Sequence, residues 1–280
     1  MTESTASPRD RIVIAPQFML RGLIAFFAAL ALAVAVVSAS AVSSSGAALA
    51  KKTGMSKRQV VQLSHLKEPR LHCENSLANR LANVGSSTQL ITIESAKFSA
   101  TRATLVVWRR VGRCWIRRFG PWATSVGFAG FSNHKVEGDG TTPAGLYSIG
   151  PVMYGTAPNP GVHFAFHSLV CGDWWDEDPT SHAYNRFEHV PCGTAPRFGG
   201  DSEALWQEKR AYPMFAVIDY NTAPVVPGRG SAIFLHADVG GPTSGCVSLP
   251  LSELEALLRW LRPLDHPIIV MGPDSEIARF

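Results

Sequence analysis

The most reactive pair of side chains stands at the two ends of one loop, in the stretch FLHADVGGPTSGCVSLP at residues 234–250. His236 closes an apolar run, and Cys246 follows nine residues rich in Gly, Pro and Thr. A thiol attacks a carbonyl as the thiolate, and a neighbouring imidazole helps it to ionise. A loop of this length can fold back so that the two side chains meet. The pair therefore predicts a cysteine nucleophile with a histidine base, and acyl transfer as the reaction.

A glycine directly before the cysteine supports the same interpretation. Gly245 lets the backbone turn tightly and present amide N–H groups to an oxyanion, which is usually the largest electrostatic aid to acyl transfer. The alternative is that His236 is an ordinary strand histidine and that residues 244–246 form an ordinary turn. The bare pair is compatible with both.

The amino terminus has the three-part pattern of an export signal. Arginines precede the apolar run Leu23–Val37, and small residues follow it up to residue 50. Because the apolar run continues through small residues, residues 23–43 are also compatible with an uncleaved membrane anchor. We therefore interpret residues 1–50 as a signal peptide or a membrane anchor. In both cases the rest of the chain is expected to be extracytoplasmic, secreted or held at the outer face of the cytoplasmic membrane.

Export makes the cysteine count informative, because thiols outside the cytoplasm are usually oxidised in pairs. The chain has five cysteines. Pairing Cys73 with Cys114 and Cys171 with Cys192 would consume four thiols and leave Cys246 over. Other pairings stay open, and a buried inert thiol is the alternative for any single cysteine. The glycine-rich setting of Cys246 favours a reactive thiol.

Behind a polar linker at residues 51–69, the pattern is that of a mainly β domain with few short helices (α+β). Short runs rich in β-branched and aromatic residues alternate with Gly, Pro, Asn and Asp clusters. The predicted strands lie at residues 89–95, 102–110, 113–119, 122–128, 145–150, 161–169, 214–221, 231–237 and 266–272.

Helical spacing of apolar residues predicts short helices at residues 74–84 and 252–263. In the second helix, Ser252 and Glu255 have the spacing of a capping box, and Pro263 is a stop signal.

Charge gives no reason to expect nucleic acid as a partner. Residues 1–50 hold three of the 26 basic and two of the 22 acidic residues, so the remainder carries 23 basic against 20 acidic side chains. This mild excess is compatible with work beside an anionic cell envelope. Six arginines nevertheless crowd the predicted hairpin at residues 102–122. The cluster is either a solvated strand face or a contact for teichoic acid or glycan.

Around the pair, the sequence resembles the L,D-transpeptidase family, also called the YkuD family. Its signature is a strand-end His, a loop, then Ser/Thr-His-Gly-Cys and an apolar residue, and here His236, Thr243 and Gly245-Cys246-Val247 match it. A second family feature, a Gly-x-x-x-Thr-Pro-x-Gly turn, is similar to GDGTTPAGLYSIG at residues 138–150. The resemblance covers about residues 86–272, and its order of His before Cys differs from papain-like and NlpC/P60-like peptidases.

Three positions depart from the family pattern. Ser244 stands where the family has a histidine before Gly-Cys, Ser248 where an arginine is common, and Ala237 where a Ser or Gly can support the catalytic histidine. The nucleophile and the base are kept, while the third catalytic member and the acceptor site differ.

The resemblance implies a β-sandwich L,D-transpeptidase-like catalytic domain at residues 70–272, followed by a C-terminal tail at 273–280. It implies that peptidoglycan stem peptides are the substrate and that no cofactor or metal takes part. Cys246 would form a thioester with a tetrapeptide stem, and an amine of a second stem would take the acyl group to make a 3–3 cross-link. Attack by water instead would make the protein an L,D-carboxypeptidase.

The resemblance also implies that the backbone N–H groups of Ser244, Gly245 and Cys246 hold the oxyanion. The candidate substrate-binding residues are Thr243 of the signature, His167 on a predicted strand, and Trp175 and Tyr184 in the loop between Cys171 and Cys192. The aromatic and acidic composition of this loop suits a lid over a cationic, peptide-like substrate. The alternatives are an ordinary structural histidine at 167 and a structural loop tied by a disulfide.

Two other classes of protein compete with this interpretation. An envelope zinc hydrolase could use His182, Glu188 and His189, although the His-x-x-x-His and Cys-x-x-Cys spacings typical of metal sites are missing. A non-catalytic cell-wall-binding domain would keep the fold alone. Acylation of Cys246 by a carbapenem would separate the enzyme from both.

Overall fold

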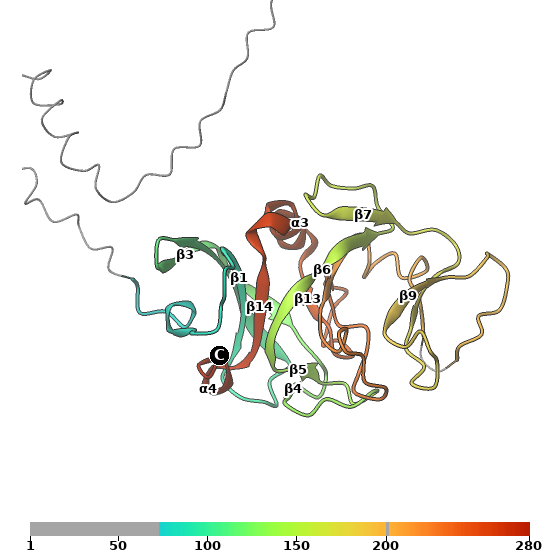
Figure 1. Ribbon diagram of the computed structural model, residues 1–280, viewed down its shortest axis with the longest axis horizontal. Coiled ribbons are helices and arrows are strands. Elements are labelled where there is room, and N and C mark those ends of the chain that lie inside the picture. Colours follow the sequence, from blue (N-terminus) through green and yellow to red (C-terminus); the bar gives the residue numbers. More distant parts are fainter. Residues whose placement is uncertain (1–72, 200–201) are drawn as a thin grey trace, which may run out of the picture. The chain divides into compact units, whose positions relative to one another are not determined.

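Strands dominate the computed structural model, which describes residues 73–199 and 202–280 (Figure 1). The described residues fall within one compact unit. The expected export segment, the anchor at 23–43 and the linker at 51–69 lie outside the described residues. None of the helices that the structure describes is long and apolar enough to cross a membrane. The prediction of a mainly β domain with few short helices is confirmed.

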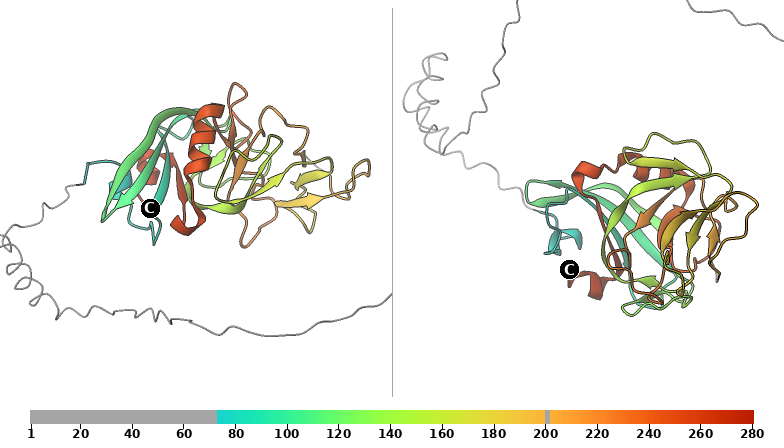
Figure 2. Two further views of the ribbon diagram at one scale, coloured as in Figure 1. Left: turned by 90° about the horizontal axis from the view of Figure 1, so that it is seen from above. Right: turned by 45° about the vertical axis from the view of Figure 1, so that its right-hand side comes forward.

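One nine-stranded sheet makes up most of the fold. In spatial order its strands are β11 (Phe215–Ile218), β12 (Phe234–Ala237), β13 (Val247–Leu249), β3 (Cys114–Ser125), β2 (Arg102–Val111), β1 (Gln89–Ser95), β14 (Ile268–Pro273), β6 (Gly145–Gly155) and β7 (Ala165–Ser168). A further pairing joins β11 to β6, so the sheet closes on itself. The two opposed walls of the expected sandwich are thus joined at both edges, and the strands curl around a common interior (Figure 2).

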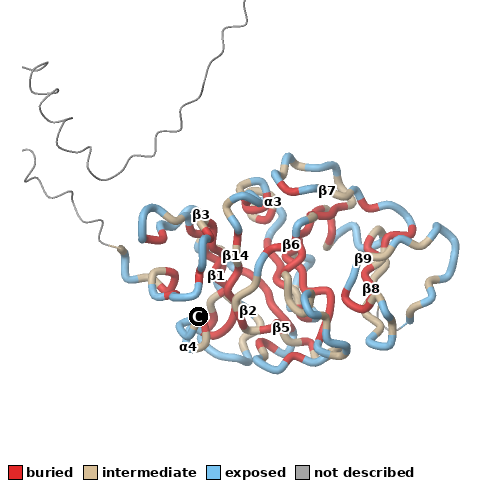
Figure 3. Tube along the Cα trace, in the orientation of Figure 1, coloured by how far each residue is buried: buried red, intermediate tan, exposed pale blue. Residues whose placement is uncertain are grey.

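The interior is apolar because alternate residues of the strands point inward. Side chains from both walls, among them Ile91, Leu105, Met153 and Leu235, are fully buried in one cluster. The helix α3 (Leu251–Trp260) adds its apolar face to the same cluster. Burial follows the central strands, and the exposed segments lie at the periphery (Figure 3).

Two predicted strands at 113–119 and 122–128 form the single strand β3. The Gly120-Pro121 pair between them makes a bulge rather than a turn, because the register against β2 shifts between the pairs Leu105–Trp122 and Val107–Phe119. A Cβ on Gly120 would lie 2.6 Å from the carbonyl oxygen of Leu105, so only glycine permits this approach.

Smaller elements surround the closed sheet. They are the 3-10 turns η1 (Ala78–Arg80) and η2 (Pro263–Asp265), the helix α4 (Asp274–Ile277), the pair β4 (Phe131–Ser132) and β5 (Thr142–Pro143), and the small sheet of β10 (Glu203–Ala204), β8 (Asp173–Asp176) and β9 (Arg186–His189).

The expected capping box of α3 is wrong. The helix begins at Leu251 after Pro250, so Ser252 already lies in the first turn and its hydroxyl donates to Glu253 Oε2 at 2.8 Å. Proline can open a helix because its fixed φ and missing N–H cost nothing there.

The segment 273–280, expected as a tail, packs on the domain. Its helix α4 buries Ile277 completely, and the carbonyl of Phe280 accepts backbone hydrogen bonds from Ala82 and Asn83. The predicted helix at 74–84 is reduced to the turn η1, beside which Leu77 and Leu81 are buried.

The expected disulfide pairing is confirmed. Cys73 is bonded to Cys114 at the start of β3, and Cys171 is bonded to Cys192 across the loop that carries β8 and β9. Cys246 is the free cysteine among the residues that the structure describes. The pairing is that of an extracytoplasmic protein.

Candidate active site

The neighbouring strands β12 and β13 position His236 and Cys246. They pair in parallel, with Leu235 opposite Val247 and His236 opposite Ser248. Cys246 directly precedes β13 and is therefore level with Phe234, two residues before His236 along the strand direction. Both side chains nevertheless line one cavity.

The turn before Cys246 is held by two threonine hydroxyls. Thr243 Oγ1 donates to the Cys246 carbonyl at 2.6 Å, and Thr142 Oγ1 donates to the Gly245 carbonyl at 2.8 Å. Thr142 belongs to the GDGTTPAG segment, and its hydroxyl also accepts the Gly127 N–H at 2.8 Å. The two segments of the family resemblance are therefore parts of one structure, in which Thr142 orients the cysteine.

Gly245 occupies a backbone conformation that favours glycine, with φ of +144°. A Cβ there would lie 3.0 Å from the Thr141 carbonyl oxygen and 3.2 Å from Lys135 Nζ. The Gly245 N–H donates to Thr243 Oγ1 at 3.2 Å, so it would have to exchange this partner to hold an oxyanion.

The thiol of Cys246 is bound by backbone groups. It donates to the Ala232 carbonyl at 3.1 Å and accepts the Phe234 N–H at 3.3 Å. Burial raises the pKa of Cys246, and the charges of Glu203 and Glu177 raise it further, whereas the Phe234 N–H and the Lys135 ammonium lower it. In this state the sulfur is a neutral thiol.

His236 is held as a neutral base. It is buried, and its Nδ1 lies 2.8 Å from the Ala237 carbonyl oxygen, which can only accept. Nδ1 therefore carries the proton and Nε2 keeps a lone pair. Burial lowers the pKa of His236, outweighing this hydrogen bond and the charge of Asp238. Nothing in the structure pairs the imidazole with the thiol, so the expectation of a thiol ionised by its histidine is not met in the free protein.

Two cavities meet at Cys246. The first, of about 290 Å³, is lined by Lys135, Glu137 and Glu177, and we name it the lysine-side cavity. The second, of about 270 Å³, is lined by His236 and Tyr212, and we name it the histidine-side cavity. Glu203, Ser244 and Cys246 line both. A thiol between two hollows suits a reaction that brings two substrates to one sulfur.

Glu203 is the charged group at this junction. Its Oε2 accepts the Tyr212 hydroxyl at 2.6 Å, and the Tyr212 ring meets the His236 ring edge to face at 5.6 Å. Burial raises the pKa of Glu203 to about 7, assisted by the charge of Glu208 and opposed by the Tyr212 hydroxyl. The carboxylate therefore changes charge near neutral pH.

We expect Glu203→Gln to make Cys246 react faster with iodoacetamide above pH 7. The amide still accepts from Tyr212 but removes the anion that disfavours the thiolate, so the pKa of Cys246 falls and labelling at pH 8 accelerates by about 3–10-fold. Labelling rates against pH, read by intact mass, check this. Glu255→Gln removes a carboxylate of α3 that lines neither cavity, and should leave the profile unchanged. Equal profiles for wild type and Glu203→Gln would contradict the electrostatic account.

Three of the predicted substrate-binding residues line neither cavity at Cys246. His167 Nε2 lies 2.8 Å from Asp173 Oδ2, and the same carboxylate holds His189 at 2.6 Å. Trp175 is buried against Phe234 and donates to Asn185.

Tyr184 is a buried support of the lysine-side cavity. Its hydroxyl donates to Glu137 and accepts the Gly230 N–H at 3.0 Å. Thr243 lines the histidine-side cavity while it braces the cysteine turn.

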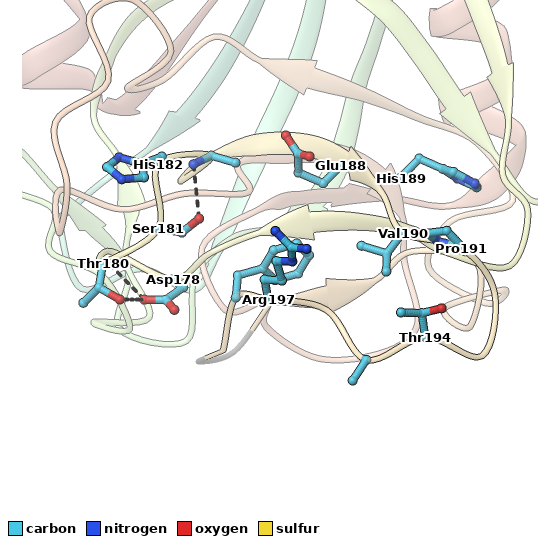
Figure 4. A pocket seen from close by; sticks show the side chains of 13 residues that line it. Asp178, Thr180, Ser181, His182, Glu188, His189, Val190, Pro191, Thr194 and Arg197 are labelled. Atoms are coloured by element: carbon cyan, nitrogen blue, oxygen red, sulfur yellow. Dashed lines mark hydrogen bonds between the residues drawn. The ribbon is translucent and has the colours of Figure 1, made fainter.

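A separate open hollow of about 580 Å³ lies between the loop closed by Cys171–Cys192 and residues 194–198 (Figure 4). The three residues of the zinc alternative, His182, Glu188 and His189, line it, with the two histidines at opposite ends in this view. In residues 73–199 and 202–280, no group of three or more His, Cys, Asp and Glu side chains could hold a metal ion.

The sequence did not indicate Lys135, Glu177, Glu203 or Tyr212. Lys135 is buried, and its ammonium pairs with Asp139 at 2.9 Å in the turn that precedes Thr142. The one feature of the sequence that could have indicated Lys135 is its position four residues before Asp139 in a Gly-rich turn. Glu203 lies in the short strand β10, and Glu177 directly follows β8. Their positions depend on the pairing of these two strands, for which the sequence has no local pattern.

A thiol and a neutral imidazole that face one cavity beside a tight glycine turn are chemically suited to acyl transfer. Comparison with known families agrees with this class: the family described as YkuD, L,D-transpeptidase catalytic domain, matches residues 98–270. The chain belongs to the YkuD family.

Other comparisons add little. No curated protein matches the chain. Among solved structures, the helical cell shape determining protein Pgp2 from Campylobacter jejuni is similar with a TM-score of 0.34 and 13% sequence identity. The match covers 67% of this chain and 48% of that one, so the chain corresponds to about half the length of Pgp2.

Proposed function

We propose that the protein is an exported L,D-transpeptidase that uses Cys246 as its nucleophile and His236 as its base. The observation that carries this is the free thiol placed where two cavities meet, with a neutral imidazole lining one of them. Membership of the YkuD family supports peptidoglycan stem peptides as the substrate.

In the first half-reaction, His236 Nε2 takes the thiol proton as the sulfur attacks the carbonyl carbon of the third residue in a tetrapeptide stem. Backbone N–H groups of residues 244–246 hold the oxyanion. The C–N bond to the terminal D-Ala then breaks, and the imidazolium returns its proton to the leaving amine. The product is a thioester on Cys246 and free D-Ala.

In the second half-reaction, the amine of another stem attacks the thioester carbonyl and gives its proton to His236. The C–S bond breaks, the thiolate recovers a proton from the imidazolium, and a 3–3 cross-link leaves. Because the neutral thiol is the resting form, we place proton transfer together with attack on the bound substrate rather than before it.

The two cavities favour transfer over hydrolysis. A carboxypeptidase needs room for one stem and a water, whereas hollows of about 290 and 270 Å³ on the two sides of the sulfur can receive a donor and an acceptor chain. The lysine-side cavity is lined by the carboxyl groups of Glu137, Glu177 and Glu203 and by the ammonium of Lys135. This excess of carboxyl groups suits an amine-bearing peptide.

Product analysis tests this proposal. The purified chain, incubated with disaccharide-tetrapeptide in ¹⁸O water, should release D-Ala and give a 3–3 dimer without ¹⁸O at the new peptide bond, as read by mass spectrometry. A tripeptide that carries ¹⁸O in its new carboxylate would instead establish an L,D-carboxypeptidase. Recovery of unchanged tetrapeptide, with retention of the chain on peptidoglycan, would establish a non-catalytic wall-binding domain.

A further inference from the structure

Four arginines share one cavity on the hairpin of β2 and β3. Its volume is about 780 Å³, and its charged lining consists of Arg109, Arg110, Arg118, Arg262 and Asp265. It shares no lining residue with the cavities at Cys246. The catalytic chemistry therefore does not account for it.

The strands place these side chains by specific features. Arg109 pairs with Gln89 of β1 on one side and with Ile116 of β3 on the other. Arg118 is the extra residue of a second bulge in β3, between the pairs Val107–Phe119 and Trp108–Arg117. Bulges redirect a side chain and recur beside binding sites. An arginine at such a position can join the others in one hollow.

Arg262 reaches the same cavity from the segment that follows α3. Its backbone N–H donates to Gln89 Oε1 at 2.7 Å, while Gln89 Nε2 donates to the Trp260 carbonyl at 2.9 Å. Gln89 is buried, so these two hydrogen bonds fix the segment that carries Arg262 against β1. The fourth arginine is thus positioned by tertiary structure and not by chance proximity along one strand.

The positive charge of the cavity is not balanced. Within the described part of the chain, none of the four guanidinium groups forms an ion pair with a carboxylate. Asp265, the acidic lining residue, accepts the Thr88 hydroxyl at 2.9 Å. Arg118 lies over the Phe119 ring at 4.5 Å, and Arg110 donates to the Gly85 carbonyl at 3.0 Å. These contacts orient the side chains and leave donors for a ligand.

We propose that this cavity binds a phosphate-bearing polyanion through at least two successive phosphate groups. Guanidinium donors match phosphate oxygens in pairs, and four positive charges against one carboxylate exceed what a single phosphate balances. The volume lies within the range of ligand sites. Bound in this way, the domain stays beside an anionic polymer while Cys246 remains accessible to its own substrate.

Calorimetric titration of the full chain with sodium tripolyphosphate tests the site. Arg109→Gln/Arg118→Gln should weaken tripolyphosphate binding by about tenfold or more, because two charge-assisted contacts are lost. The matched control is Arg113→Gln/Arg117→Gln, which removes the same charge from the same hairpin at positions that are exposed like Arg109 and Arg118 but lie outside the cavity. It should change the Kd by no more than about twofold. Arg109→Lys/Arg118→Lys, which keeps the charge, should give an intermediate loss.

Two further arms identify the source of the phosphate. Inorganic phosphate should bind more weakly than tripolyphosphate, because the cavity is proposed to bind successive phosphate groups. Co-sedimentation with phosphatidylglycerol vesicles tests whether the phosphate belongs to a lipid headgroup. If Arg109→Gln/Arg118→Gln loses vesicle binding and Arg113→Gln/Arg117→Gln keeps it, the site is assigned to membrane phosphate. Equal weakening by both double variants, or no saturable binding in any arm, would overturn the assignment. Thermal unfolding of each variant verifies that the chain remains folded.

Discussion

Cys246→Ala should lower the turnover of tetrapeptide stems by about 10⁴–10⁶-fold, because it removes the atom that forms the thioester. The thiol is also the hydrogen-bond partner of Ala232 and Phe234, so the free energy of unfolding should fall by about 1–2 kcal/mol. D-Ala release and 3–3 dimer formation, followed by chromatography at matched protein concentration, measure the first effect. Chemical denaturation measures the second.

Ser244→Ala is the matched control for this prediction. Ser244 lines both cavities beside the thiol, yet its side chain has no catalytic role in the proposed reaction, and its backbone N–H is kept. Turnover in this variant should stay within a few fold of wild type. A Cys246→Ala protein that folds and still releases D-Ala would remove the cysteine from the mechanism and make His236 and the carboxylates of the two cavities the next candidates for the nucleophile.

The free cysteine and a histidine on the same cavity could be predicted because their determinants are local. His236 ends a run of apolar residues, Gly245 precedes the cysteine, and five cysteines leave one over when the others form disulfides. The strands could be predicted for the same reason, since β-branched and aromatic residues gather in short segments such as residues 89–95 and 102–110, with turn residues between them. The bulge at Gly120-Pro121 could not be predicted, because it depends on the close approach of the β2 backbone to Gly120.

The carboxylates around the Cys246 thiol could not be predicted, because their positions depend on contacts between segments far apart in the sequence. Glu177 and Glu203 approach Cys246 only because β8 and β10 pair in the small sheet, and such pairings join segments that share no sequence pattern. The residues expected to touch substrate, Trp175 and Tyr184, have aromatic rings that the fold uses for burial instead. A Trp or Tyr in a loop indicates a large buried area as readily as a binding surface.

The pKa of the thiol is the clearest case of a property set by tertiary structure. Sequence proximity suggested an imidazole that ionises the cysteine, whereas burial and two carboxylates oppose ionisation and the imidazole itself is kept neutral. In the proposed reaction, Cys246 would therefore stay a neutral thiol until substrate binds. A neutral thiol resists oxidation better than a thiolate, since thiolate character governs oxidation.

His236→Ala should lower turnover by about 10²–10⁴-fold, the usual contribution of a general base, and leave the iodoacetamide profile of Cys246 nearly unchanged. The reason is that the imidazole lines the cavity but is not bonded to the thiol, so it acts when substrate binds and not on the resting sulfur. Because burial lowers the pKa of His236, wild-type activity should fall only as the pH drops below the ordinary histidine value of 6.5, where the base becomes protonated.

The rate of thioester formation and the pH dependence of alkylation, measured on the same preparations, check both parts of this prediction. His167→Ala is the control histidine: it pairs with Asp173, lines neither cavity at the thiol, and should leave turnover within about twofold of wild type. A large rise in the alkylation pKa of His236→Ala would show that the imidazole does ionise the resting thiol. Retained turnover in His236→Ala would transfer the role of base to Glu203, whose carboxylate borders both cavities and titrates near neutral pH.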